Sequence, residues 1–239
     1  MRAALTAAII VAGGTGERLG RLGGKQLASV LGRPVLSWTL AAFDAAEAVD
    51  LIVVVCHPDR VEEYGRIAVD PLALATEVLF APGGETRQAS VASGLSKVPE
   101  TVRTVLVHDG ARPVVTPGLI GEALAALAAD PQAGGLVVGY PAVDTLKVVS
   151  NHIIAQTPER SRLWAVQTPQ VFPANVLRAA YDTAAADGFL GTDDASLVER
   201  MGERVVVFEG PRDNIKVTVA EDLLFVEAAL RFRAEGSAE

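Results

Sequence analysis

The sequence predicts an α/β fold, Rossmann-like, in which helices cover both faces of a doubly wound, mainly parallel sheet. Short apolar runs alternate with helix-like stretches along most of the 239 residues, which is the order typical of parallel sheets. The runs are continuously apolar, as expected of strands buried on both faces. Aromatic residues make up 5% of the chain, so the core should be aliphatic. The length suits a single α/β domain over 1–239.

The first strand is predicted over 5–12, a continuous apolar run. Pro34 favours a helix over 34–46, because proline lacks the N–H that a first helical turn leaves unpaired. The alternation then continues along the chain. It predicts strands at 51–56, 77–81, 104–108 and 134–139 and helices at 58–68, 85–97 and 117–129.

A predicted β-hairpin interrupts this pattern. Two β-rich runs flank Ser150-Asn151-His152, a turn-forming sequence. Because an isolated two-stranded ribbon is marginally stable, this arm, at about 141–162, needs a partner surface, and a second subunit is the simplest. We therefore expect a protruding dimerisation arm. Beyond it, the pattern predicts helices at 173–186, 193–201 and 220–233 and strands at 204–208 and 215–217.

Composition excludes several classes of partner. The formal net charge is -8, and without a basic stripe a nucleic-acid partner is not expected. The apolar runs are too short to cross a bilayer and no signal peptide is visible, so no membrane role is expected. The single cysteine, Cys56, cannot form an internal disulfide and suits a reducing, cytoplasmic location. At the end of an apolar run, it is expected to be a core residue.

A glycine-rich turn at 12–20 directly follows the first strand. Backbone N–H groups in such a turn can approach phosphate oxygens closely. The turn fits neither the dinucleotide fingerprint, because Leu19 replaces the third glycine, nor a Walker A loop, because Gln26 follows Lys25. Arg18 and Lys25 would then stabilise charge on a pentacoordinate phosphorus and on leaving pyrophosphate. A solvated surface turn is the alternative.

A second signal is Asp109, directly after the strand predicted at 104–108. Residues at the carboxyl ends of parallel strands line the crevice where such sheets bind ligands. Asp109 could hold Mg²⁺ against a triphosphate, since Mg²⁺ takes few carboxylates and lets the substrate supply other ligands. The alternative is that it only starts a turn. His108 has no evident partner and is expected to be structural.

The third signal is the segment 82–90, in which two glycines precede a predicted helix. It permits close backbone approach, although a helix-capping turn explains it equally well. Further along, Asp193 and Asp194 stand at a predicted helix start, where capping is favoured over a site role. Trp164 is expected to be a packing anchor near the arm.

Together with four later motifs, these segments resemble the 2-C-methyl-D-erythritol 4-phosphate cytidylyltransferases of the non-mevalonate isoprenoid pathway. The resemblance runs from about residue 7 to residue 225. The later motifs are Asp144-Thr145-Leu146-Lys147, Gln167-Thr168-Pro169-Gln170, Thr192-Asp193-Asp194-Ala195-Ser196 and Asn214-Ile215-Lys216-Val217-Thr218.

The resemblance implies transfer of CMP from CTP to methylerythritol phosphate, with Mg²⁺, by a homodimer whose active site is shared between subunits. The catalytic cations it implies are Arg18, Lys25 and Lys216. The nucleotide-binding residues it implies are Ala12, Gly13, Gly14, Gly84, Glu85, Ser90, Asp109 and Gly110, with Asp109 also on the metal. The acceptor-binding residues it implies are Arg112, Thr145, Arg160, Thr168 and Lys216. Of these, Arg112, Thr145 and Arg160 would reach the neighbouring subunit's site.

Two departures from the family pattern stand out, Gly24 where proline is usual and Glu85 where aspartate is usual. The glycine would make the loop less rigid when empty. A cytidylyltransferase acting on ribitol 5-phosphate is the nearest alternative, because only acceptor contacts distinguish the two. A non-catalytic nucleotide sensor is an alternative of another class, but it would be expected to have lost Arg18, Lys25, Asp109 or Lys216.

Overall fold

The computed structural model describes residues 5–14 and 24–236. Within these residues, seven strands form one sheet in the order β11-β7-β10-β6-β1-β4-β5. Strands β6, β1, β4 and β5 are parallel to one another, as are β7 and β11, whereas β10 is antiparallel to both its neighbours. The bounds are β1 Leu5–Val11, β4 Leu51–Cys56, β5 Glu77–Pro82, β6 Val102–Asp109, β7 Gly135–Pro141, β10 Trp164–Pro173 and β11 Val205–Glu209.

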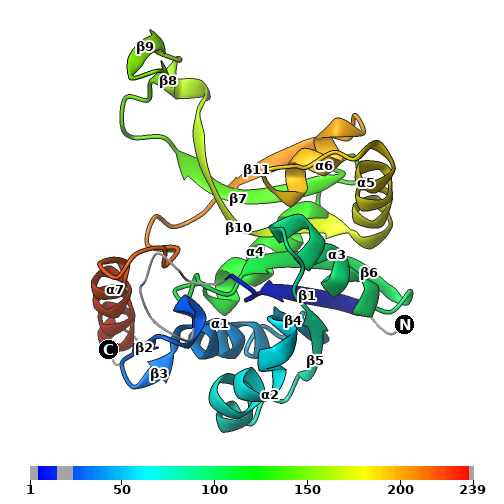
Figure 1. The fold of residues 1–239 in the computed structure, drawn as a ribbon, viewed down its shortest axis with the longest axis vertical. Helices are drawn as coiled ribbons and strands as arrows, with labels where there is room; N and C mark the ends of the chain where they lie inside the picture. The colour runs from blue at the N-terminus through cyan, green and yellow to red at the C-terminus, as the bar shows by residue number, and fades with distance from the viewer. Residues whose placement is uncertain (1–4, 15–23, 237–239) are drawn as a thin grey trace.

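Helices cover both faces of this sheet (Figure 1). One core cluster joins the sheet to α1 (Val35–Asp44), α2 (Val61–Tyr64) and α4 (Pro117–Ala128). A second cluster joins the opposite face to α3 (Arg87–Lys97), α5 (Ala174–Asp187) and α6 (Asp194–Arg200). A third, smaller cluster lies under the last helix, α7 (Asp222–Gly236). Among the helices in the described residues, none combines the length and apolar character needed to span a membrane.

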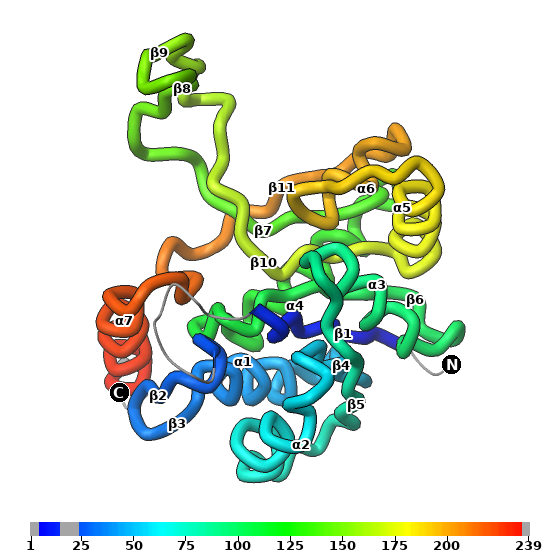
Figure 2. The backbone as a smooth tube through the Cα atoms, in the orientation of Figure 1, coloured from blue at the N-terminus to red at the C-terminus, as the bar shows by residue number. Residues whose placement is uncertain are grey.

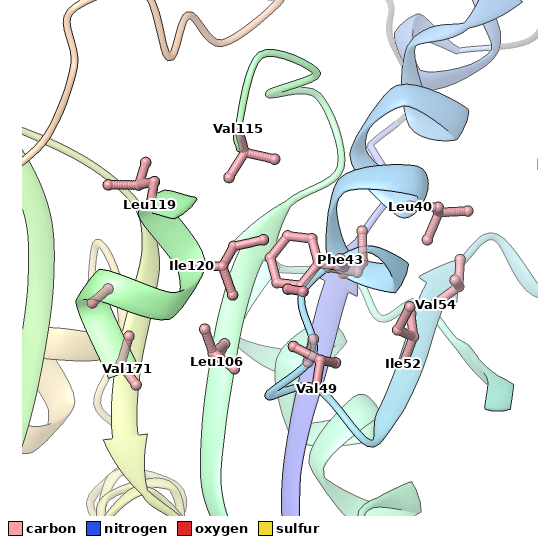
Figure 3. Close-up of a cluster of buried hydrophobic side chains, with 14 of the residues drawn as sticks. Leu40, Phe43, Val49, Ile52, Val54, Leu106, Val115, Leu119, Ile120 and Val171 are labelled. Carbon is pink, nitrogen blue, oxygen red and sulfur yellow. The ribbon is translucent and has the colours of Figure 1, made fainter. Parts of the chain in front are cut away.

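Neighbouring residues of a strand supply opposite faces of the core. Ile10 belongs to the cluster that contains Phe43 and Ile120, which Figure 3 shows between α1, α4 and the sheet. Ile9, the preceding residue, belongs to the cluster with Val91 and Leu177. This burial on both sides explains why the strands read as continuous apolar runs.

Most predicted elements are confirmed to within three residues, including all strands from 5–12 to 134–139 and the strand at 204–208. The helix predicted at 58–68 is broken instead into a 3₁₀ turn Pro58–Arg60, the single α-turn of α2, a π-helical stretch Gly65–Val69 and a further 3₁₀ turn Asp70–Leu72. The strand predicted at 215–217 is wrong. This segment passes the carboxyl end of β6, where the N–H of Val217 bonds to the carbonyl of Ala111 at 2.8 Å, and it extends no ladder.

Strand β10 was not predicted, because polar residues and two prolines interrupt its apolar pattern. It is nevertheless buried along most of its length and lies between β6 and β7. Its pairing with β7 shifts register between Val166 and Gln170. The irregular stretch places Thr168 directly behind Asp109 at the end of β6.

The predicted hairpin is confirmed as β8 (Val148–Ser150) and β9 (Ile153–Gln156), which stand away from the body of the protein (Figure 2). Asn151 and His152 both have positive φ, 48° and 62°, as in the primed turns that connect short hairpins. A 3₁₀ turn, Arg160–Arg162, leads from the arm into β10. A smaller hairpin, β2 (Ser29–Val30) and β3 (Arg33–Pro34), precedes α1.

Candidate active site

A pocket of about 680 Å³ lies at the carboxyl ends of β1, β5 and β6. These strands are parallel, so the segments that follow them meet at one edge of the sheet. In chain order, β4 and β5 are added on one side of β1 and β6 on its other side, and parallel sheets bind ligands at such a change of side. A separate cavity of about 540 Å³ between α3 and α5 contains none of the predicted site residues. The predicted residues that line the 680 Å³ pocket are Gly13, Gly14, Lys25, Gly84, Glu85, Ser90, Asp109 and Lys216.

Asp109 is the electrostatic centre of this pocket. The Nζ atom of Lys216 lies 2.7 Å from its carboxylate, the Nε atom of Arg87 3.5 Å and the Nε atom of Arg112 3.6 Å. Burial alone would raise the pKa of Asp109, but the ammonium of Lys216 and the guanidinium of Arg87 outweigh it and hold that pKa below its usual range. The carboxylate is therefore ionised, and the cations around it outnumber it.

This excess of positive charge suits a polyanionic ligand. In a protein of net charge -8, cations gathered at one pocket create a local field that attracts phosphates. Lys216 is the most accessible of the three, with its side chain 35% exposed. A triphosphate bound here would meet fixed charges already in place, the arrangement that stabilises developing charge most effectively.

The segment between β5 and α3 is held by its own hydrogen bonds. The N–H of Gly84 donates to Oγ of Ser90 at 3.0 Å, and the Ser90 hydroxyl donates to the carbonyl of Thr86 at 2.9 Å. Thr86 in turn caps α3 by accepting from the N–H of Ala89. A Cβ at Gly84 would lie 2.6 Å from Cβ of Ala89, so only glycine fits there without moving the helix. The helix-capping turn is confirmed, and the same segment lines the pocket, so the capping role does not exclude nucleotide binding, which stays a prediction.

Of the glycine turn after β1, the structure describes only residues 12–14, and the chain is described again from Gly24. Ala12 is buried and its N–H bonds to the carbonyl of Val55 at 2.7 Å. Arg18 lies outside the described residues. Lys25 begins a 3₁₀ turn, Lys25–Leu27, and lines the pocket. Gly24 before it has φ +76°, a conformation closed to proline, whose ring holds φ near about −65°.

Asp109 is positioned from behind by a buried polar pair. Its N–H donates to Oγ1 of Thr168 at 3.1 Å, and the same hydroxyl bonds Nδ1 of His108 at 3.1 Å. Complete burial lowers the pKa of His108 to about 3, so its ring is neutral and structural, as predicted. Thr168 therefore supports Asp109, a role that the motif did not suggest, and its direct contact with an acceptor stays a prediction. Gly110, directly after β6, is not among the residues that line the pocket, and it donates its N–H to the carbonyl of Val11 at 2.9 Å.

Arg112 corrects one expectation. It was predicted to reach a neighbouring subunit's site, but it lies beside Asp109 of its own chain and donates to the carbonyl of Asn214 at 2.7 Å. The reason is that Arg112 directly follows the end of β6 and is held there by its own chain. Thr145 and Arg160 are on the exposed arm and its base. Arg160 donates to the carbonyl of Val143 at 2.8 Å and, with Arg212, lines a cavity of about 490 Å³.

Arg87 is a pocket residue that the sequence pattern did not single out. Its Nη2 atom lies 2.8 Å from the carboxylate of Asp194, which is 0% exposed. The hydroxyl of Tyr181 donates to the other oxygen of Asp194 at 2.5 Å. The capping role predicted for Asp193 is confirmed by a capping box with Ser196. Asp194 instead pairs with Arg87, and the only sequence signal was that both belong to polar motifs at helix starts.

The carboxylates lining the described pocket are Asp109 and Glu85. Within the described residues, no group of three or more His, Cys, Asp or Glu side chains could enclose a metal ion. Mg²⁺ commonly binds through one or two carboxylates, with phosphates and water completing its shell. This donor set fits a Mg²⁺ ion that arrives with a triphosphate, and it does not form an all-protein cage.

Comparison with known proteins agrees with this geometry. The chain matches the family described as 2-C-methyl-D-erythritol 4-phosphate cytidylyltransferase over residues 6–232. A protein of that name from Thermosynechococcus vestitus is 43% identical over 95% of this chain and 96% of its own length. A second, from Caldanaerobacter subterraneus, is 41% identical over 94% of this chain and 98% of its own length.

Solved structures lead to the same family. A 4-diphosphocytidyl-2C-methyl-D-erythritol synthase from Anaerococcus prevotii superposes with a TM-score of 0.82 at 30% identity, covering 95% of this chain and 98% of that chain. A 2-C-methyl-D-erythritol 4-phosphate cytidylyltransferase from Thermus thermophilus gives a TM-score of 0.75 at 33% identity, covering 93% of this chain and 98% of that chain. With its pocket, its sheet and its sequence in agreement, the chain belongs to the 2-C-methyl-D-erythritol 4-phosphate cytidylyltransferase family.

Proposed function

We propose that this protein transfers CMP from CTP to 2-C-methyl-D-erythritol 4-phosphate, giving 4-diphosphocytidyl-2-C-methyl-D-erythritol and pyrophosphate, as a step of isoprenoid precursor synthesis. The membership of the cytidylyltransferase family supports the reaction type. The observation that carries the proposal is the pocket in which Lys25, Lys216 and Asp109 meet two glycine turns. Such a site suits two phosphorylated substrates that must be held together.

The chemistry needs little from the protein beyond positioning. An oxygen of the acceptor's phosphomonoester is already anionic near neutral pH, because the second pKa of such a group is about 6. It attacks the α-phosphorus of CTP in line, forming a new P–O bond. The bond to the bridging oxygen breaks, and its electron pair leaves with pyrophosphate. No general base is required for this attack, because the nucleophile carries no proton that must be removed.

The nucleotide is held by backbone and side chains at the pocket edge. In the proposal, Ala12, Gly13 and Gly14 present the triphosphate turn, with Gly110 directly after β6. Gly84, Glu85 and Ser90 supply the base and ribose site. The pinned turn at Gly84 supports this assignment, because its backbone is fixed before any ligand arrives.

The cations offset the repulsion between the two polyanions. Lys25 and Lys216 would act on the triphosphate and the acceptor phosphate, together with Arg18 from the glycine turn. Arg112 lies next to Lys216 around Asp109 and is proposed to act in the site of its own chain. Thr168 holds Asp109 in place from behind.

We propose Asp109 as the protein ligand of Mg²⁺. When bound, Mg²⁺ would screen the charge of the triphosphate and orient its oxygens. Asp109 is suited to this because the surrounding cations keep it ionised. The Nζ atom of Lys216 lies 2.7 Å from one carboxylate oxygen of Asp109. This ion pair orients the carboxylate and would hold the ammonium close to the phosphates.

The arm supports a homodimer with a shared site. Its side chains Val149, Ile153 and Ile154 are 55%, 71% and 59% exposed, which is costly for an apolar surface that has no partner. A second copy of the chain would cover them. Thr145 and Arg160 would then reach the neighbouring subunit's pocket, where Arg160 could bind the acceptor.

Mixed dimers test the shared site. Arg160→Ala and Lys25→Ala proteins should each be nearly inactive, whereas subunits exchanged between them should recover about a quarter of the sites, since only one site of each mixed dimer is intact. Size exclusion and a tag on one variant verify that mixed dimers have formed. Mixed dimers without recovered activity would show that Arg160 does not act across the interface.

The reaction itself is tested by pyrophosphate release with CTP and Mg²⁺, comparing methylerythritol 4-phosphate with ribitol 5-phosphate. Release with the first acceptor alone is expected. Release with only ribitol 5-phosphate would keep the chemistry and change the substrate. No release with either acceptor, from protein that binds CTP, would refute the proposed activity.

A further inference from the structure

We propose that Asp194 is a positioning residue for nucleotide binding, which acts by holding the guanidinium of Arg87 partly away from Asp109. The inference rests on the proposed function and adds to it a determinant of nucleotide affinity outside the pocket. A line of contacts carries it: Tyr181 on α5, Asp194 at the start of α6, Arg87 at the start of α3 and Asp109 at the end of β6.

The buried end of this line is an ion pair. Asp194 is 0% exposed, and a charge removed from water in this way requires a partner. Arg87 supplies it at 2.8 Å, and Tyr181 donates to the other carboxylate oxygen. Both carboxylate neighbours, Asp194 and Asp109, raise the pKa of Arg87 against the opposing effect of burial, so the guanidinium stays charged.

The helix that carries Arg87 is also tied to the chain leading to α6. The side chain of Gln88 donates to the carbonyl of Phe189 at 3.0 Å and accepts from the N–H of Gly191 at 2.9 Å. The distance between the start of α3 and the start of α6 is therefore set independently of the ion pair. Arg87 spans this distance from a rigid base.

The exposed end of the line reaches the nucleotide pocket. Arg87 lines the pocket with its side chain 28% exposed, and its Nε atom lies 3.5 Å from Asp109. The guanidinium is thus closer to Asp194 than to Asp109. Without the charge of Asp194, a guanidinium would be free to form the two-pronged pair that arginine prefers with a carboxylate. Asp109 would then be occupied by Arg87 and less available to the incoming nucleotide.

The substitution that isolates this effect is Asp194→Asn. It keeps the size of the side chain and an acceptor for Tyr181 but removes the charge that holds Arg87. Affinity for CTP with Mg²⁺, measured by titration calorimetry without an acceptor, should fall about tenfold, a coupling typical of contacting charged residues. In an Arg87→Gln background the same substitution should change the dissociation constant by less than about twofold, because no guanidinium remains to move.

Two further variants separate positioning from folding. Asp193→Ala removes the side-chain cap of α6 together with the hydrogen bond that Asp193 accepts from Gln170. It should lower the thermal unfolding temperature, with CTP affinity within about twofold of the parent protein, since these contacts stabilise the helix and leave the charge of Asp194 in place. Tyr181→Phe removes one hydrogen bond to Asp194 while keeping the ring. It should weaken CTP binding about threefold, again only when Arg87 is present, and it keeps the test available if Asp194→Asn fails to fold.

Dependence of both effects on Arg87 would support the inference. Equal loss of affinity with and without Arg87, or unchanged affinity in folded Asp194→Asn protein, would overturn it while leaving the proposed function intact. A parent protein that does not bind CTP would overturn the inference and the proposed function together.

Discussion

Removing Lys216 should separate catalysis from stability. Among the described residues its Nζ atom is the cation nearest to Asp109, at 2.7 Å, but the guanidinium groups of Arg87 and Arg112 lie within 3.6 Å of the same carboxylate. Lys216→Ala therefore leaves Asp109 paired, unlike the removal of a sole partner. The Lys216 side chain is 35% exposed, so water and salt screen its ion pair, and its loss should cost less than about 1 kcal/mol of folding free energy.

The same change should be far more costly to the reaction. Lys216 faces the pocket in which two polyanions must approach each other, and losing one fixed charge at such a site typically lowers turnover by roughly 10²–10³-fold. Lys216→Arg keeps the charge but not the compact ammonium. Its turnover should be reduced only about tenfold, which makes it a matched control for the loss of charge.

The assay is pyrophosphate release at saturating CTP and acceptor, paired with thermal unfolding of each variant. The expected pattern is a large loss of turnover for Lys216→Ala beside a small shift of the unfolding temperature. Turnover within about threefold of the parent protein would refute the electrostatic role, because that is far below the loss expected for a charge aligned with the reacting phosphates. A collapse of stability would show instead that Lys216 is part of the structural framework.

Three other changes test different features. Lys25→Ala should lower turnover by about 10²–10³-fold in folded protein, and near-normal turnover would remove it from its role. Gly24→Pro forces φ +76° to change sign and should weaken CTP binding about tenfold, as expected for a strained backbone position; unchanged binding by calorimetry would show that this conformation is not required. Burial raises the pKa of Cys56 to about 11 from 9.0, so the unfolded chain loses that proton first. This stabilisation is complete below pH 9.0 and lost by about pH 11, at up to about 1.4 kcal/mol per pH unit. Urea unfolding at several pH values between 9.0 and about 11 should show a steeper loss of stability in the parent than in Cys56→Ala, in which the buried tyrosines with raised pKa remain.

Local patterns were enough to predict most of the sheet and the centre of the site. A strand buried on both faces must be apolar at every position, and that composition is visible in the sequence of β1 or β4 alone. Parallel strands also place their carboxyl ends at one edge, so Asp109 could be assigned to the pocket without coordinates. The hairpin was also predictable from a local pattern, because its turn and its two short strands are neighbours in sequence.

Other features depended on which distant segments pack together. Strand β10 is polar in sequence but becomes a strand because β6 and β7 flank it on both sides. The strand expected at 215–217 has the right composition, but the segment lies beyond the carboxyl end of β6, where the N–H of Val217 bonds to the carbonyl of Ala111 and no ladder is formed. Composition favours a strand, but a ladder also requires a neighbouring backbone with unpaired groups.

The sequence by itself determined the order of the elements, the glycine turns and the charged residues available to the site. Only the tertiary structure decided that Arg87 would join Asp194 to Asp109, that Arg112 would lie beside Asp109 of its own chain and that Thr168 would support Asp109 from behind. The physical reason is the distance along the sequence over which the interactions act. Helix and strand patterns arise from neighbours in sequence, whereas the partner of a buried charge is chosen by the packing of segments far apart in the chain.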